Sequence, residues 1–322
     1  MQQIKILHID LESEYKSLYL EALPEAKHIF CSKEEFEANL SLYKNVGILN
    51  LFIHNSISKE ILKVFKNLKL INTRSTGYNH LDLDALKKSK TLVSNVPEYG
   101  SDTVAEHTFA LIMGLYKNTS SLEEHSEKGN YEANKNFLGK DLNGKTIGVI
   151  GGGKIGKNVI QIAQGFDMKV LVYDIYQDGF LEQILNCKFV SLNYLLENSD
   201  IITLHTPLNS STNQLIDEES LGRLHKGVTI INTARGELIS NSILLKGLEQ
   251  NIISGVGLDT IEGEVELIEG EKNPEQEKLL HHPKVIFTGH NAYHTKEAID
   301  RIQQTSIRNI KSFINGNPIN LV

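Results

Sequence analysis

Polar and ionisable residues follow a series of apolar runs in the second half of the chain. They are His205-Thr206-Pro207, Thr233-Ala234-Arg235, Asp259 and His290. Apolar runs that alternate with amphipathic stretches predict parallel strands, and an open parallel sheet binds ligands beyond the carboxyl ends of its strands. Histidine exchanges protons near neutral pH, and the arginine fork holds carboxylates or carbonyls. The pattern predicts a binding and proton-transfer site at one edge of a sheet.

A glycine-rich turn, Gly151-Gly152-Gly153-Lys154-Ile155-Gly156, fits the pattern G-x-G-x-x-G. An apolar run at 146–150 leads into it, an amphipathic stretch at 157–166 follows, and a second apolar run at 169–173 comes next. Such hexapeptides also occur as plain structural turns, but strand, turn, helix and strand in this order favour a dinucleotide site. We expect its glycines and the helix N-terminus, Lys154 and Ile155 included, to bind a diphosphate.

An acidic residue, Asp174, ends the second of these strands. It lies close to the spacing of about 20 residues at which a carboxylate binds the adenosine ribose of a dinucleotide. A carboxylate there accepts hydrogen bonds from the ribose hydroxyls and repels a 2′-phosphate. The expected cofactor is therefore NAD, not NADP.

These residues need two sets of elements to position them. The first half has strand-like runs at 4–9, 46–53, 69–73 and 91–94 and helical stretches at 59–66 and 82–88. The second half has strand-like runs at 146–150, 169–173, 200–204, 228–232, 253–258 and 285–288, then a helix at 296–313. The order predicts two doubly wound, parallel α/β domains, the second inserted into the first.

Between the two series lies a nearly all-apolar helix at 103–117, capped by Ser101 or Asp102. A helix of this composition must be buried, either between domains or against a second subunit. We expect residues 1–100 and 293–322 to form one domain. Residues 101–292 form the other, which includes this helix within 102–118.

Composition narrows the class of protein. The chain has 322 residues, a net charge of −7 and a pI near 6.0, with no basic face for nucleic acid. No apolar run is long enough to span a membrane, and the N-terminus resembles a strand more than a signal peptide. The two cysteines, Cys31 and Cys187, have no CxxC spacing, which favours reduced thiols and a cytoplasmic setting.

Several motifs in order resemble the D-isomer-specific 2-hydroxyacid dehydrogenases, and most closely their D-lactate dehydrogenase-like branch. They are INTRSTGYNHLDLDAL from Ile71, SNVPEYGSDTVAEHTFALIMGL from Ser94, GKTIGVIGGGKIGK from Gly144, LHTPLNSSTNQLI from Leu204, INTARGELI from Ile231, GVGLDTIEGE from Gly255 and FTGHNAY from Phe287. The resemblance implies a Rossmann NAD-binding domain inserted into a flavodoxin-like substrate domain. It also implies a homodimer formed through the long helix.

The resemblance implies a role for each site residue. His290 is the general acid/base, Glu264 its partner and Arg235 the substrate clamp. The substrate is a small 2-keto or 2-hydroxy acid, most simply pyruvate and D-lactate, further held by Ser75-Thr76-Gly77 amides and lined by Tyr99. The implied cofactor-binding residues are Gly151, Gly153, Lys154, Ile155, Gly156, Asp174, His205, Thr206, Pro207, Thr233, Ala234, Asp259 near the nicotinamide, and His290.

Some readings of the site stay open. Glu262 and Glu266 flank Glu264, so the register of the acidic partner could differ. His290 and His294 could be metal ligands only on a helix, which Gly289 disfavours, so no metal is expected. Gly289 itself stands where most family members have proline and could loosen the setting of the histidine.

Other functions are also open. Glyoxylate, hydroxypyruvate or branched 2-keto acids could be the substrate. NAD-sensing corepressors of the family carry long disordered extensions and phosphoglycerate dehydrogenases often carry a regulatory domain, neither of which is visible here. Formate dehydrogenases have glutamine where Glu264 stands.

Overall fold

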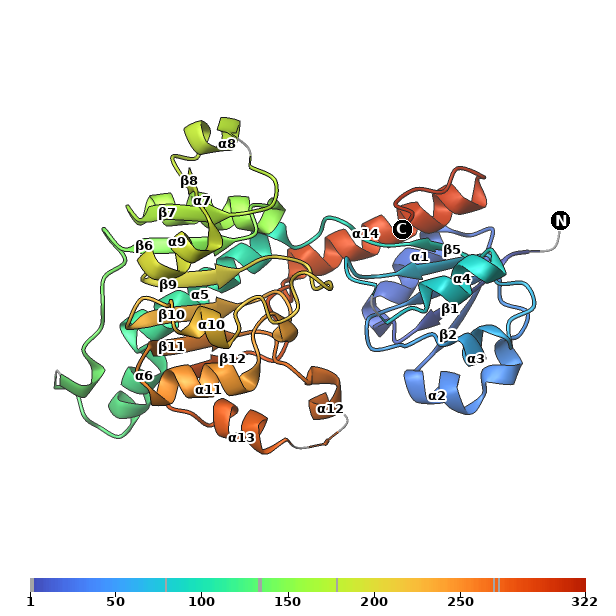
Figure 1. The fold of residues 1–322 in the computed structure, drawn as a ribbon. Coiled ribbons are helices and arrows are strands. Elements are labelled where there is room, and N and C mark those ends of the chain that lie inside the picture. Colours follow the sequence, from blue (N-terminus) through green and yellow to red (C-terminus); the bar gives the residue numbers. More distant parts are fainter. Residues whose placement is uncertain (1–2, 79, 133–134, 178, 269, 272) are drawn as a thin grey trace. The chain divides into compact units, whose positions relative to one another are not determined.

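The computed structural model describes residues 3–78, 80–132, 135–177, 179–268, 270–271 and 273–322 (Figure 1). The chain forms two compact units, Met1–Tyr99 with Thr295–Val322 and Gly100–His294. The expected boundaries, after residue 100 and before residue 293, differ by one and two residues from the boundaries of the units, which fall at Tyr99–Gly100 and His294–Thr295. Among the described residues, no helix is long and apolar enough to cross a membrane.

The first unit is built on a five-stranded parallel sheet of order β2-β1-β3-β4-β5, the flavodoxin-like order. Its strands are β1 (Lys5–Ile9), β2 (Lys27–Cys31), β3 (Ile48–Leu51), β4 (Leu70–Thr73) and β5 (Leu92–Ser94). Its helices are α1 (Lys16–Ala22), α2 (Lys33–Ala38), α3 (Lys59–Leu62), α4 (Leu83–Ser89) and α14 (Lys296–Ile314), with 3₁₀ turns η1 (Ser13–Tyr15) and η2 (Leu40–Tyr43).

Side chains of successive strand residues alternate between the faces of this sheet, as a pleated strand requires. Ile6, Ile48 and Leu70 pack with α1 and with the Ile307 and Ile310 side chains of α14. Their strand neighbours Leu7, Leu49 and Ile71 pack with α2, α3 and α4 on the opposite face. Both faces are therefore covered by helices.

The second unit is a seven-stranded parallel sheet of order β12-β11-β10-β9-β6-β7-β8. Its strands are β6 (Thr146–Ile150), β7 (Lys169–Tyr173), β8 (Lys188–Phe189), β9 (Ile201–Leu204), β10 (Val228–Asn232), β11 (Ile253–Leu258) and β12 (Val285–Phe287). Because β6 lies between β7 and β9, the strand order reverses there, which is the switch point where Rossmann folds bind ligands.

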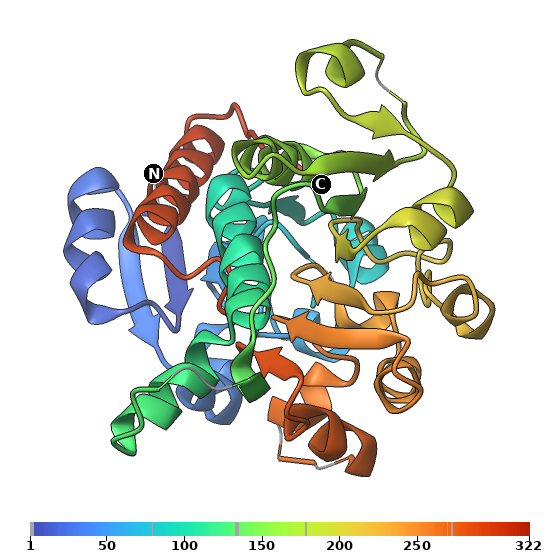
Figure 2. The same ribbon diagram turned by 90° about the vertical axis from the view of Figure 1, so that its left-hand side faces the viewer.

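Helices cover both faces of the second sheet. On one face lie α5 (Ser101–Lys117) and α7 (Lys154–Gly165), which pack together over the sheet (Figure 2). The opposite face has the helices α9 (Leu192–Asn198), α10 (Glu218–Leu221), α11 (Asn241–Glu249) and α13 (Pro274–Leu280). The remaining elements are α6 (Thr119–Glu127), η3 (Lys135–Phe137), α8 (Gly179–Ile184), η4 (Gly236–Leu238) and α12 (Glu264–Ile268). Much of the apolar surface of α5 is thus buried inside its own unit.

Candidate active site

The glycine-rich turn follows β6 directly. Gly151 has a φ of +102°, and a Cβ there would lie 2.7 Å from the carbonyl of His205. A Cβ at Gly156 would overlap the Gly151 carbonyl oxygen, whereas one at Gly153 would have no atom within 4 Å. The turn therefore needs glycine at two positions for packing and leaves open space at the third, where α7 begins. That open helix N-terminus fits a diphosphate.

Asp174 binds the same turn. Its Oδ2 accepts a hydrogen bond from the backbone N–H of Gly152 at 2.7 Å, and its Oδ1 accepts one from that of Tyr176 at 2.9 Å. The carboxylate thus joins the end of β7 to the glycine-rich turn. This position beside the turn is the one that discriminates between dinucleotides in a Rossmann fold.

The segment after β9 contains buried polar atoms without partners. His205 Nδ1 and Thr206 Oγ1 have no hydrogen-bond partner within the described ranges, while His205 Nε2 pairs with Thr203 Oγ1 at 2.8 Å. Burial lowers the pKa of His205 to about 3, so its imidazole is neutral. Unsatisfied polar atoms beside the glycine-rich turn fit a bound cofactor, which can supply the missing partners.

The end of β10 turns sharply to present Arg235. The Asn232 side chain accepts from the Ala234 N–H at 3.0 Å and donates to the Arg235 carbonyl at 2.7 Å. The guanidinium of Arg235 is half-buried and donates to the Ala234 carbonyl at 2.6 Å. Thr233 Oγ1 pairs with Thr108 Oγ1 of α5 at 3.1 Å.

His290 and Glu264 lie in direct contact. His290 Nδ1 is 2.7 Å from Glu264 Oε1, and both side chains are largely buried. Because a carboxylate can only accept, Nδ1 carries the donated proton and Nε2 is left to exchange a proton with a ligand. The neighbouring Glu262 instead accepts from the backbone N–H of Asn241 at 3.0 Å, at the start of α11. The acidic partner of His290 is therefore Glu264.

Asp259 holds the loop that carries His290. Its side chain is 1% exposed, and its oxygens accept from the N–H groups of Asn291 at 2.8 Å and Ala292 at 3.0 Å and from Thr288 Oγ1 at 2.6 Å. Its carbonyl accepts from the His290 N–H at 2.6 Å. Both carboxylate oxygens are engaged with the loop, a role that the sequence analysis did not foresee.

The predicted substrate residues Ser75, Thr76, Gly77 and Tyr99 belong to the first unit. Ser75 Oγ donates to the Gly77 carbonyl at 2.6 Å and pairs with Thr73 Oγ1 at 2.7 Å. Thr76 Oγ1 donates to the Val96 carbonyl at 2.8 Å. Side-chain bonds of this kind fix the backbone of the loop after β4.

A family model described as "D-isomer specific 2-hydroxyacid dehydrogenase, NAD binding domain" matches residues 109–292. The chain belongs to this family. A D-specific alpha-keto acid dehydrogenase of Enterococcus faecium is 37% identical over 267 residues, which cover 80% of this chain and 80% of the relative. A hydroxypyruvate reductase of Blautia hydrogenotrophica is 33% identical and covers 82% and 81%.

The solved structures agree. The D-lactate dehydrogenase of Aquifex aeolicus, complexed with NAD and lactic acid, has a TM-score of 0.86 and 34% identity, and the match covers 97% of this chain and 96% of that one. The protein is an NAD-dependent D-2-hydroxyacid dehydrogenase. The expected family, fold class and cofactor are confirmed.

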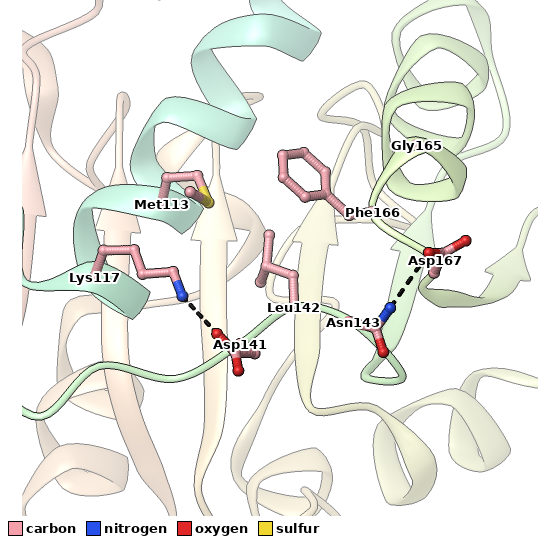
Figure 3. A pocket seen from close by; sticks show the side chains of 8 residues that line it. All are labelled: Met113, Lys117, Asp141, Leu142, Asn143, Gly165, Phe166 and Asp167. Atoms are coloured by element: carbon pink, nitrogen blue, oxygen red, sulfur yellow. Dashed lines mark hydrogen bonds and ion pairs between the residues drawn. The ribbon is translucent and has the colours of Figure 1, made fainter.

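A cavity of about 330 Å³ lies near the amino ends of β6 and β7 in the second sheet (Figure 3). It is lined by Met113, Lys117, Asp141, Leu142, Asn143, Gly165, Phe166 and Asp167. These residues lie at the end of α5 and before β6 and β7, whereas the glycine-rich turn follows the carboxyl end of β6. The cavity is therefore separate from the dinucleotide site.

Proposed function

We propose that this enzyme uses NADH to reduce a small 2-keto acid to the D-2-hydroxy acid, with pyruvate and D-lactate as the principal pair. The observation that carries the proposal is the 2.7 Å contact between His290 Nδ1 and Glu264 Oε1, with His290 on a loop that Asp259 holds in place. The similarity to a D-lactate dehydrogenase complexed with lactic acid supports the choice of substrate. Hydroxypyruvate, glyoxylate and branched 2-keto acids are the alternatives, and a hydroxypyruvate reductase is among the relatives.

In the proposed reaction, His290 Nε2 gives a proton to the C2 carbonyl oxygen, and the Glu264 carboxylate stabilises the imidazolium before that transfer. Bound NADH supplies the hydride that C2 receives. The Arg235 guanidinium and the backbone N–H groups of Ser75, Thr76 and Gly77 hold the substrate carboxylate, and Tyr99 lines the substrate. One keto acid, one NADH and one proton thus give one hydroxy acid and one NAD⁺.

Cofactor contacts are part of the same proposal. We assign the diphosphate to Gly151, Gly153, Lys154, Ile155 and Gly156, and the adenosine ribose to Asp174. The residues proposed for the nicotinamide half are His205, Thr206, Pro207, Thr233, Ala234, Asp259 and His290. The unpartnered Nδ1 of His205 and Oγ1 of Thr206 support this assignment.

We also propose a cytoplasmic homodimer that forms through α5 and the segment after it. The exposed apolar side chains Leu122, Tyr131 and Leu138 follow α5 and support this interface. Sedimentation equilibrium tests it, since a monomer at micromolar concentration would contradict the dimer.

The test of function is NADH oxidation with 2-keto acids of graded size, followed by chiral analysis of the product. We expect the highest kcat/KM with pyruvate and formation of D-lactate. A higher kcat/KM with hydroxypyruvate, glyoxylate or a branched keto acid would favour the alternatives. L-Lactate as product would contradict the proposed orientation of the substrate.

A further inference from the structure

Two buried amide side chains contact the turn at residues 262–263, which precedes Glu264. Gln276 of α13 is 1% exposed and Asn241 of α11 is 2% exposed. Neither residue belongs to the groups proposed above to touch substrate or cofactor. Both helices pack on the face of the second sheet opposite α5.

The amide groups of both side chains donate to the backbone of this turn. Gln276 Nε2 donates to the carbonyl oxygens of Glu262 at 2.6 Å and Gly263 at 2.8 Å. Asn241 Nδ2 donates to the same Glu262 carbonyl at 3.1 Å, and the Asn241 N–H donates to Glu262 Oε2 at 3.0 Å. Four hydrogen bonds thus converge on two consecutive residues.

The turn is shaped to fit Gln276. Gly263 has a φ of +73°, and a Cβ there would lie 2.7 Å from Gln276 Nε2. The amide oxygens of Gln276 and Asn241 are buried without a hydrogen-bond partner in the described part of the chain. Burying an amide whose oxygen is unsatisfied costs stability, so an apolar residue would serve packing better. The buried amides are therefore explained by the hydrogen bonds that their N–H groups donate to the carbonyl oxygens of the turn.

Glu264 follows this turn and begins α12, which is weakly anchored by its own side chains. None of the described α12 side chains is fully buried, Val265 and Ile268 are each 64% exposed, and only the half-buried Leu267 packs against the core of the second unit. The position of the Glu264 carboxylate against His290 therefore depends on the backbone at 262–263. We propose that Gln276, assisted by Asn241, is a positioning residue that holds Glu264 in register with His290.

This inference rests on the proposed function of the Glu264–His290 pair, and a double-mutant cycle separates the two. In Gln276→Met, which keeps length but loses both donors, we expect kcat for keto-acid reduction to fall about tenfold, more than KM rises. The alkaline limb of the pH–rate profile should move to lower pH, as in Glu264→Gln, because the imidazolium loses its carboxylate neighbour. In the Glu264→Gln background, Gln276→Met should change kcat less than about twofold.

Two further variants complete the test. Asn241→Ala keeps the backbone hydrogen bond to Glu262 and should shift the pH–rate profile in the same direction as Gln276→Met, but by less. This variant keeps the inference testable if Gln276→Met does not fold. The control is Gln303→Met in α14, a buried glutamine (2% exposed) that accepts from Tyr19 Oη at 2.8 Å. It should lower the unfolding temperature without moving the pH profile.

The outcomes are distinct. If Glu264→Gln leaves the profile unmoved, the pairing in the proposed function is wrong. If Glu264→Gln moves the pH–rate profile but Gln276→Met does not, Gln276 has only a structural role and the inference is overturned. The same conclusion follows if the fold-decreases in kcat of the two single variants multiply fully in the double variant.

Discussion

Asp174 makes two bonds that the spacing of the dinucleotide motif does not reveal, to the N–H groups of Gly152 and Tyr176. Its carboxylate therefore shapes the glycine-rich turn as well as opposing a 2′-phosphate. Removal of the charge has to be distinguished from removal of both acceptors. The isosteric Asn variant removes the charge and keeps one of the two acceptor oxygens, because its amide nitrogen can only donate, whereas the Ala variant removes both.

For cofactor choice, we expect kcat/KM with NADH to exceed that with NADPH in the native enzyme. Asp174→Asn should lower this preference about tenfold or more, equivalent to about 1.4 kcal/mol, because the repulsion of a 2′-phosphate is lost. Asp174→Ala should lower it too and should also reduce the unfolding temperature, since two N–H groups lose their acceptor. Equal efficiency with both cofactors in the native enzyme would contradict the assignment.

Arg235 tests the substrate clamp. Arg235→Lys keeps the charge and loses the planar pair of donors, so we expect KM for the keto acid to rise and kcat to fall, together about 100-fold in kcat/KM. NADH affinity, measured by fluorescence titration, should change less than about twofold because the guanidinium is assigned to the substrate. Near-normal keto-acid kinetics in this variant would remove Arg235 from the mechanism.

At the scale of elements, strands that are buried on both sides could be predicted from sequence. The bounds 146–150, 169–173, 228–232 and 253–258 are confirmed because these strands are largely apolar and helices cover both faces of their sheet. β2 (Lys27–Cys31) was not predicted, because only Cys31 of its five residues is buried at this sheet edge. The predicted helix at 59–66 is wrong in length, and α3 ends at Leu62.

Contacts made by turns could be predicted less well from the sequence. α7 begins at Lys154, not 157, because Gly153 is its N-cap and the turn passes directly into the helix. Glu264 and His290 are in contact, as expected from the sequence. Nothing in the spacing of the residues, however, indicates that Asp259 holds the His290 loop or that Gln276 holds the turn before Glu264. Those contacts join segments far apart in the sequence.

The His290 loop has an unusual backbone. Gly289 has a φ of +63° and His290 a φ of +58°. Proline fixes φ near −65°, so the proline of most family members cannot adopt the conformation found at Gly289. The glycine is therefore part of how this loop places its histidine.

Gly289→Ala should destabilise the enzyme by about 1 kcal/mol, because the left-handed backbone disfavours a side chain while the nearest atoms, at 3.8 Å and 3.9 Å, leave room for the Cβ. Gly289→Pro should also lower kcat by displacing His290. Urea unfolding and keto-acid kinetics measure both effects. Gly165→Ala, at the end of α7 with no φ in the left-handed region, is the control and should be neutral or stabilising. If Gly289→Pro has the stability and kcat of the native enzyme, the loop can also adopt the backbone conformation that proline requires.

At the scale of the whole molecule, the first unit has a row of hydrogen-bonded polar side chains across its sheet. Each side chain donates to the next, and the distances are 2.8–3.0 Å. In order, the row is Asn320, Asn309, Asn72, Asn50, His8 and His28, and it ends on the Leu23 carbonyl. The direction requires an unprotonated Nδ1 on His8, since this atom accepts from Asn50.

Acid should weaken this unit through its histidines. Burial, reinforced by His28 and Arg74, lowers the pKa of His8 well below its usual value, and burial, reinforced by His54, lowers the pKa of His80 to about 4. As the pH falls below the unfolded value of 6.5, the unfolded chain binds protons that the folded unit does not. The free energy of unfolding then falls by about 1.4 kcal/mol per pH unit for each such histidine, until the folded pKa is reached.

We therefore expect the stability of the enzyme to decrease between about pH 6.5 and about pH 4, measured by urea unfolding at a series of pH values. His8→Gln should reduce this slope, because glutamine can accept from Asn50 and donate to His28 without taking up a proton. The exposed His225 provides the control, and His225→Gln should leave the slope unchanged. If His8→Gln has the native slope, His8 is not among the groups that couple acid to unfolding, and the polar row carries no pH dependence of its own.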